Sequence, residues 1–423
     1  MQNTINETVI MFNILPVWPG PEYPKSDIFA VDYKITDISD SGPLLIWHEL
    51  NGDPMAPPFN TILDGTLFSK LDAAVIDRVN NKTAWIVINT ANECVGPTYT
   101  DEEVRVDYLN LHEILAASAT KHGIDPTSVI WLTGDLNAED KLRDLTPIHV
   151  VSSCVFVSLV HRMITAHQTE VSMATFSHPY NFKNVAISPN RHINSHRTYM
   201  ITRLVQLELL HKINYSFPRN IHGKTISDGY CDLKIKSNIS STFDRHELID
   251  WTGLAVTCLE LYQCELPLTI DVDPNTNTCL GLDAFLTLKQ PYQDSVYSIL
   301  TESHADGGKC FISEALVVAI VMQTPFLLVG NRGVLAQMQA WGLHTFDDLF
   351  DESYDDEVDD IKRYEMIIEQ IQRIDDMPWD ELLAIRMNMK QKLQENFDRL
   401  ATLSVELDQA LSDKLSRIIA NSN

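Results

Sequence analysis

Apolar and polar positions alternate in blocks along the chain, and the clearest pattern runs from Val296 to Gly330. Val296 to Thr301 and Pro325 to Val329 are short apolar runs that predict buried strands, and Phe311 to Met322 predicts an apolar helix between them. A strand, a helix and a second strand in this order indicate a βαβ unit of a parallel sheet. The polar loop before the helix then lies at the carboxyl end of a strand, where such sheets bind ligands.

The same alternation continues on both sides of this unit. Other short apolar runs predict strands at Pro43 to Leu50, Trp85 to Asn89, Ser128 to Leu132 and Val185 to Ser188. Helical spacing predicts helices at Gly65 to Val79, Glu102 to His122, His196 through Ile213, His246 to Tyr262, Arg332 to Trp341, Ile361 to Ile374 and Trp379 to Ala420. Strands that alternate with helices predict an α/β protein with two Rossmann-like domains and a long C-terminal helical tail. We place the boundaries at residues 1–178, 179–376 and 377–423.

Length, charge and cysteine usage narrow the class of protein. A chain of 423 residues exceeds what one hydrophobic core usually supports, which agrees with two domains. The formal net charge of −26, concentrated in residues 347–360, disfavours a broad basic surface for nucleic acid. Seven scattered cysteines without a C-x-x-C pair indicate reduced thiols rather than a disulfide framework or a zinc site. No apolar run approaches the ~20 residues that span a membrane, and no signal peptide begins the sequence, so we expect a cytoplasmic protein.

Two carboxylates follow predicted strands in the first domain. Glu93 lies just after the strand that ends at Asn89, and Asp135 lies just after the strand that ends at Leu132. Either carboxylate is a candidate general base that accepts a proton from a hydroxyl group. Asp135 is also a common residue at turns and helix N-termini, so a purely structural role stays open for it.

Cationic side chains gather after the strand that ends at Ser188. They are Arg191, His192, His196, Arg197 and Arg203. The planar guanidinium of arginine matches phosphate oxygens, and the amides of a helix N-terminus add partial positive charge. The cluster therefore predicts a phosphate site, with a solvated helix face that pairs with acidic residues as the alternative.

The loop and helix start after the central strand carry the other candidate ligand-binding residues: Glu302, Ser303, Lys309, Ser313 and Glu314. Glu314 lies near the predicted start of the helix, where a carboxylate suits the helix dipole and can accept hydrogen bonds from sugar hydroxyls. Helix capping alone would also place serine or glutamate there.

These residues carry a resemblance to a known family. Glu302-Ser303, Phe311 to Glu314 and Thr324 to Gly330 resemble the donor-binding half of fucosyltransferase-like glycosyltransferases of the GT-B fold. Trp341 to Asp360 is similar to a segment of bacteriophage-encoded proteins, and the resemblance spans residues 185–376.

The resemblance implies a metal-independent transferase that uses a nucleotide diphosphate sugar, with a UDP-sugar as first choice and no further cofactor. It implies that Arg191 and Arg197 hold the diphosphate and that Glu302 and Glu314 bind sugar or ribose hydroxyls. Glu93 or Asp135 would then activate the acceptor. A GT-A alternative would use the D-x-D spelling at residues 271–273 as a metal site.

The phage resemblance implies a hydroxylated or hydroxymethylated pyrimidine of phage DNA, or a modified nucleotide, as acceptor, with arabinose or glucose as the sugar. A surface glycan or lipopolysaccharide is the enzymatic alternative. A non-catalytic, acidic GT-B-like protein that binds or inhibits a partner by resembling DNA is the alternative from another class. The apolar seam of the tail (Leu393, Phe397, Leu400, Leu403, Leu407 and Leu411) is also suited to a homodimer.

Overall fold

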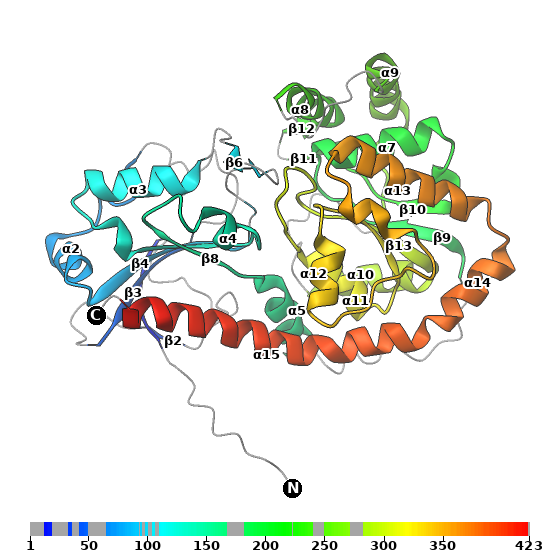
Figure 1. Cartoon of the computed structure of the whole chain (residues 1–423). Coiled ribbons are helices and arrows are strands. Elements are labelled where there is room, and N and C mark those ends of the chain that lie inside the picture. The colour runs from blue at the N-terminus through cyan, green and yellow to red at the C-terminus, as the bar shows by residue number, and fades with distance from the viewer. Residues whose placement is uncertain are drawn as a thin grey trace, which may run out of the picture. The chain divides into compact units, whose positions relative to one another are not determined.

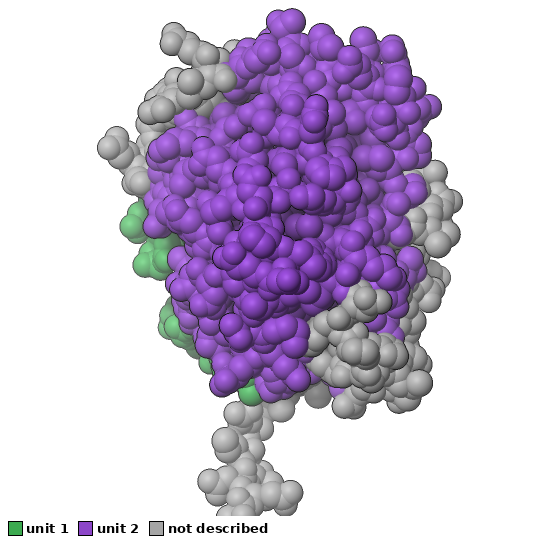
Figure 2. Space-filling view, turned by 90° about the vertical axis from the view of Figure 1, so that its right-hand side faces the viewer, with its two compact units in different colours: residues 1–162, 402–423 green, residues 163–401 purple. Residues whose placement is uncertain are grey.

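The computed structural model describes residues 12–18, 33–35, 42–49, 65–92, 94, 98–99, 104–105, 110–166, 182–221, 223–239, 249–270 and 282–421. The chain divides into two compact units, which Figure 2 colours separately. Unit 1 comprises residues 1–162 and 402–423, and unit 2 comprises residues 163–401. The tail expected at residues 377–423 is thus shared between the two units.

Unit 1 is built on a parallel sheet, whose described strands follow the order β2-β1-β3-β4-β7-β8. The strands are β1 (Phe12–Trp18), β2 (Tyr33–Ile35), β3 (Leu44–Glu49), β4 (Ala84–Thr90), β7 (Val129–Thr133) and β8 (His149–Ser152). β4 and β7 are buried along their whole length, which explains their unbroken apolar sequences.

Side chains of α2 (Ala73–Asn80), α3 (Leu111–Lys121) and α4 (Ala138–Leu142) are buried in the core against this sheet. Unit 1 also contains the 3-10 turn Pro126–Ser128 and α5 (Val155–Ala166), whose last residues belong to unit 2. A small antiparallel ribbon joins β5 (Thr98–Tyr99) to β6 (Val104–Arg105). Val79, Leu115 and Trp131 are fully buried in the core of the unit.

Unit 2 contains a second parallel sheet, whose described strands follow the order β10-β9-β13-β14. The strands are β9 (Asn184–Ser188), β10 (Ile213–Tyr215), β13 (Ser295–Thr301) and β14 (Phe326–Val329). β13 is buried along its whole length, as the sequence predicts. The fold class predicted from the sequence, two Rossmann-like units with a long C-terminal helix, is therefore confirmed by the topology of the two sheets.

Helices cover both faces of this sheet (Figure 1). The helices of the unit are α7 (Ser195–Gln206), α8 (Ile226–Ile239), α9 (Trp251–Glu260) with its π-helical extension (Leu261–Glu265), α10 (Leu282–Gln293), α11 (Glu314–Val321), α12 (Val334–Ala340), α13 (Asp360–Asp375) and α14 (Trp379–Asn388). Of these, α8 and α9 pack on α7. Short elements complete the unit: the 3-10 turns Leu210–Lys212 and Glu352–Asp356, and the ribbon of β11 (Asn220–Ile221) and β12 (Lys224–Thr225). α13 packs beside α7, with the rings of Tyr199 and Tyr364 centred 5.9 Å apart.

The predicted tail ends in the long helix α15 (Lys390–Asn421). Its first part belongs to unit 2, where Arg399 Nε donates to Trp341 O at 2.8 Å. Its last part belongs to unit 1, where Ser158 Oγ donates to Asp408 Oδ1 at 2.6 Å. The leucines predicted as a dimer seam are largely buried within the chain itself: Leu393, Leu400, Leu403 and Leu411.

Several predicted boundaries are wrong for identifiable reasons. The helix predicted through Ile213 ends at Gln206, because Glu208 adopts a left-handed backbone with φ of 57° and Ile213 begins a strand. The helix predicted from Gly65 begins only at Ala73, where Asp72 Oδ1 accepts the amide of Val75 and caps it.

Candidate functional site

The topology of the second sheet indicates where a ligand can bind. β9 has β10 on one side and β13 on the other. The connection after β9 therefore runs toward one edge of the sheet, and the connection after β13 runs toward the opposite edge. In open parallel sheets this reversal separates the two following loops and leaves a ligand crevice at the carboxyl ends of the strands. Here the loops are residues 189–194 and 302–313, which hold five of the predicted site residues: Arg191, Glu302, Ser303, Lys309 and Ser313. We call these two loops, with the first turn of α7, the crevice loops.

Glu302 is the most deeply buried carboxylate of the crevice loops. Its side chain is fully buried, and Oε2 accepts the amide of Ser313 at 3.0 Å. Oε1 has no hydrogen-bond partner within the described part of the chain. Burial raises the pKa of Glu302 from 4.5 to about 7, against the opposing hydrogen bond from Ser313. A carboxyl of this kind changes protonation near neutral pH.

Ser313 and Glu314 form the start of α11. Ser313 is the N-cap residue, and its Oγ accepts the amide of Ala315 at 3.2 Å. Glu314 is half-buried in the first turn. The structure thus brings Glu302, Ser313 and Glu314 together, and Ser313 performs the capping that the sequence left open.

Arg197 and His196 fasten the start of α7 to the end of β13. Arg197 Nη2 donates to Thr301 O at 2.7 Å and to Glu302 O at 3.2 Å. His196 Nε2 lies 2.8 Å from the same Glu302 O, so this nitrogen carries the proton. Burial and the charge of Arg197 lower the pKa of His196 to about 3, so the imidazole is neutral and not one of the expected cations.

The other residues predicted to bind the sugar donor are partly exposed in the crevice loops. Ser303 is half-buried, and its carbonyl accepts Asn194 Nδ2 at 3.2 Å, which ties the two loops together. Arg191 and Lys309 are half-buried. Diphosphate binding by Arg191 and by Arg197 stays a prediction, and the contacts of Arg197 show that it also supports the loop.

Lys236 of α8 is a site residue that sequence reasoning missed. Its Nζ forms an ion pair with Asp306 in the crevice loop and donates to Ser195 Oγ at 3.1 Å. Burial alone would raise the pKa of Asp306, but Lys236 and Lys309 outweigh it and hold the pKa well below its usual range. α8 and the loop are some 70 residues apart in the sequence, so no local pattern announces this contact.

A buried scaffold supports the loop from α13. Arg363 Nη2 donates to Ala305 O at 2.6 Å and forms a buried ion pair with Asp360. Tyr364 OH donates to the same carbonyl at 2.7 Å. Gly307 has a φ of 82°, a left-handed backbone that favours glycine, and its amide donates to Asp360 at 3.3 Å. The loop backbone is therefore fixed at several points.

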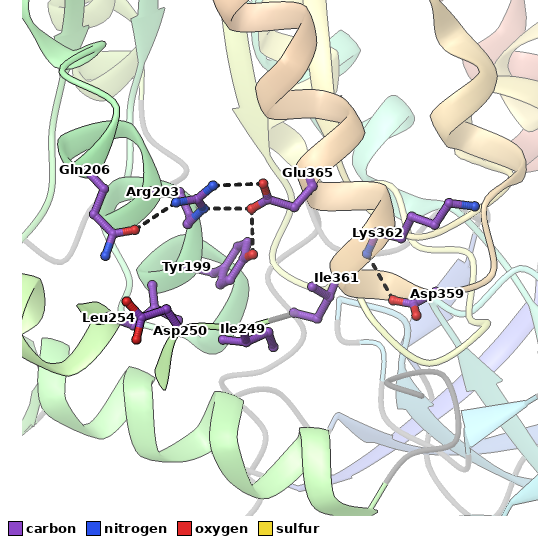
Figure 3. A pocket seen from close by; sticks show the side chains of 10 residues that line it. All are labelled: Tyr199, Arg203, Gln206, Ile249, Asp250, Leu254, Asp359, Ile361, Lys362 and Glu365. Atoms are coloured by element: carbon purple, nitrogen blue, oxygen red, sulfur yellow. Dashed lines mark hydrogen bonds and ion pairs between the residues drawn. The ribbon is translucent and has the colours of Figure 1, made fainter. Parts of the chain in front are cut away.

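A separate pocket of about 290 Å³ lies between α7, α9 and α13 (Figure 3). Arg203 binds Glu365 through two hydrogen bonds of 2.8 and 3.0 Å, and Tyr199 OH donates to Glu365 at 2.6 Å. The cation expected of Arg203 is thus paired with an acidic residue, as the alternative interpretation of the cluster held. Leu254 and Ile361 supply apolar walls.

The candidate bases of the first domain belong to unit 1. Glu93 lies outside the described residues. Asp135 is buried at the end of β7, where its Oδ1 accepts the amide of Asn137 at 3.1 Å and its carbonyl accepts Ser152 Oγ at 2.7 Å. These bonds hold a turn, and the catalytic role of Asp135 stays a prediction.

The described ranges contain neither a cluster of metal ligands nor a helix suited to crossing a membrane. No group of three or more His, Cys, Asp or Glu side chains there is arranged to hold a metal ion. The D-x-D spelling at residues 271–273 lies outside those ranges. No described helix is both long and apolar enough to cross a membrane.

Comparisons with known proteins give one distant likeness. No protein-family model matches the sequence, and no curated protein matches it. Among solved structures, the α,α-trehalose 6-phosphate synthase of Burkholderia multivorans is similar at 12% identity and a TM-score of 0.40. The match covers 90% of this chain and 71% of that one. A likeness this distant assigns no activity, so function has to be argued from the crevice loops.

Proposed function

We propose that this chain is a glycosyltransferase that moves a sugar from a nucleotide diphosphate sugar to a hydroxyl acceptor. The supporting observation is the chemistry gathered by the crevice loops at the reversal point of the second sheet. Lys236 brings a cation to the start of α7, and Arg191 adds another from the loop after β9. Glu302 and Glu314 bring carboxyl groups to the start of α11. A diphosphate linked to a polyhydroxylated sugar satisfies both kinds of group.

The proposed reaction balances without a further co-reactant. The acceptor oxygen forms a bond to the anomeric carbon of the sugar while the bond from that carbon to the diphosphate oxygen breaks. The diphosphate leaves with the electron pair, and cationic side chains together with helix N-terminal amides stabilise its charge. The proton of the acceptor hydroxyl passes to a carboxylate, for which Asp135 and Glu93 are the candidates.

For the acceptor we propose a hydroxylated or hydroxymethylated pyrimidine of phage DNA, with arabinose or glucose as the transferred sugar. The net charge of −26 favours a nucleotide over a long duplex, because a duplex is repelled by a strongly acidic surface. A surface glycan is the other acceptor class, and it is tested in the same assay.

The same charge favours a second candidate function of another kind. An acidic protein can imitate DNA and occupy the basic surface of a DNA-binding partner. Such a protein would bind no nucleotide sugar and would associate with a protein partner in a salt-sensitive manner.

The deciding experiment exposes the full-length protein to UDP, GDP, ADP, CMP and dTDP sugars and measures thermal unfolding and slow donor hydrolysis. We expect one nucleotide class to raise the unfolding temperature. Glu314→Ala should then lower turnover about ten- to hundredfold, the value of one or two hydrogen bonds to a charged group. Glu369→Ala, the same change at an exposed site on α13, is the matched control. No stabilisation by any donor contradicts the proposal and favours the acidic binding protein.

A further inference from the structure

The carboxylate of Asp306 occupies a position suited to a bound anion. Its Oδ2 is ion-paired with Lys236 Nζ, and Lys309 on the same loop adds a second favourable charge. Lys236 Nζ also donates to Ser195 Oγ, in the first residue of α7. An internal carboxylate therefore sits among the cations of the crevice loops, beside a helix start.

This ion pair is accessible to a solute. The side chain of Lys236 is 43% exposed and that of Asp306 is 20% exposed. Lys236 holds the pKa of Asp306 well below its usual range, so separating the pair costs free energy that a ligand must replace with its own ion pair to Lys236. A ligand with more negative charge than one carboxylate can compete for the same ammonium group.

The loop backbone need not move when the carboxylate leaves. Ala305 O is held by Arg363 and Tyr364, and Asp306 O accepts Asn331 Nδ2 at 2.8 Å. Rotation of the Asp306 side chain about its own bonds is enough to vacate the position. The exchange of one anion for another thus requires a rotamer change rather than a rearranged loop.

We propose that Lys236 binds the diphosphate of the donor and that Asp306 occupies this position until the donor displaces it. This inference rests on the proposed function and adds to it a phosphate-binding lysine and an internal competitor. Asp306 therefore discriminates against weakly charged ligands. A ligand with a single negative charge attracts Lys236 no more strongly than the carboxylate that it would replace. A diphosphate carries two or more charges and gains more.

The test measures the dissociation constants of UDP and of inorganic pyrophosphate by calorimetry on the full-length protein and its variants. Asp306→Asn removes the competitor, and we expect binding about tenfold tighter, since like charges at contact distance repel strongly. Lys236→Met should weaken binding about tenfold or more, because it removes the ammonium partner. In the double variant Lys236→Met/Asp306→Asn, the asparagine should tighten binding very little relative to Lys236→Met alone. The cation for which the ligand and Asp306 compete is then absent.

Matched controls separate this role from general effects of charge and folding. Lys234→Met removes the same charge from an exposed position of α8, and Asp348→Asn removes a carboxylate that pairs with Lys392 elsewhere in unit 2. Both should leave the dissociation constants within about twofold, as expected for screened surface charges. Lys236→Arg keeps the charge and should retain most of the affinity, and thermal unfolding confirms that each variant is folded.

The outcomes distinguish this inference from the proposed function. If the wild-type protein binds UDP and neither Asp306→Asn nor Lys236→Met changes the affinity, the inference is wrong and the proposed function stands. If neither the wild type nor Asp306→Asn binds UDP or pyrophosphate, the inference fails, and the proposed function fails with it when none of the five classes of nucleotide sugar stabilises the protein either. Binding that becomes measurable only in Asp306→Asn supports the displacement directly.

Discussion

The buried carboxyl of Glu302 makes the stability of unit 2 depend on pH in a calculable way. Its side chain is fully buried at the end of β13, and one carboxylate oxygen accepts the amide of Ser313. Burial raises its pKa from 4.5 to about 7. We expect Glu302→Gln, which preserves the shape of the side chain and cannot ionise, to remove this pH dependence.

The sign follows from proton linkage. The folded protein holds the Glu302 proton more tightly than the unfolded chain, so the contribution to stability is fully present below pH 4.5 and is lost as pH rises through about 7. One pKa unit corresponds to about 1.36 kcal/mol, so the change amounts to about 3 kcal/mol. The free energy of unfolding of Glu302→Gln, relative to wild type, should therefore increase by about 3 kcal/mol between pH 4 and pH 8.

The measurement is urea unfolding at both pH values, followed by hydrogen exchange of the β13 amides so that the signal reports on unit 2. The difference between variant and wild type cancels the titration of all other groups. Comparing that difference between the two pH values also cancels the constant cost of burying the glutamine amide. Glu369→Gln, at an exposed site, is the control and should show no such change. A difference between Glu302→Gln and wild type that stays constant from pH 4 to pH 8 would refute the assignment of a raised pKa.

Three further substitutions test the packing described above. Arg363→Met should lower the free energy of unfolding in urea by about 3–5 kcal/mol, because it leaves the buried Asp360 carboxylate without its ion-pair partner. Adding Asp360→Leu should restore part of this loss. No restoration would contradict this account. Gly229→Ala should lower the thermal midpoint, because its Cβ would clash with the Thr198 hydroxyl of α7 and the cost of about 1–3 kcal/mol exceeds the gain in helix propensity. Leu415→Ala, at a fully buried site of α15, should cost about 2–5 kcal/mol, whereas Val405→Ala on the exposed face should stay within about 0.5 kcal/mol.

The parts of the fold that the sequence predicts well are those whose burial is uniform. β13 and β14 are buried along their whole length, so their composition alone marks them as strands of a parallel sheet. Glu208 illustrates the limit: apolar spacing continues past it, but its left-handed backbone ends α7. Nothing in the residue type requires this conformation, because tertiary packing overrides local propensity.

The sequence predicts where in the fold the candidate site lies, but it predicts few of the contacts that its residues make. Glu302, Ser313 and Glu314 were predictable because they follow a buried strand and begin a helix. A guanidinium can donate to a phosphate or to a backbone carbonyl, so the sequence does not reveal that Arg197 contacts Thr301 O and Glu302 O. Lys236 reaches the crevice loops only through the packing of α8 on α7, which depends on long-range contacts.

That packing depends on the missing side chain of Gly229. The glycine lies seven residues before Lys236, two turns along the same face of α8, and it lets this helix approach Thr198 of α7 closely. The spacing between the helices therefore sets how far the lysine ammonium extends toward Ser195. Given the proposed role of Lys236, a larger residue at position 229 would change ligand binding without contacting the ligand, by altering the separation of two helices.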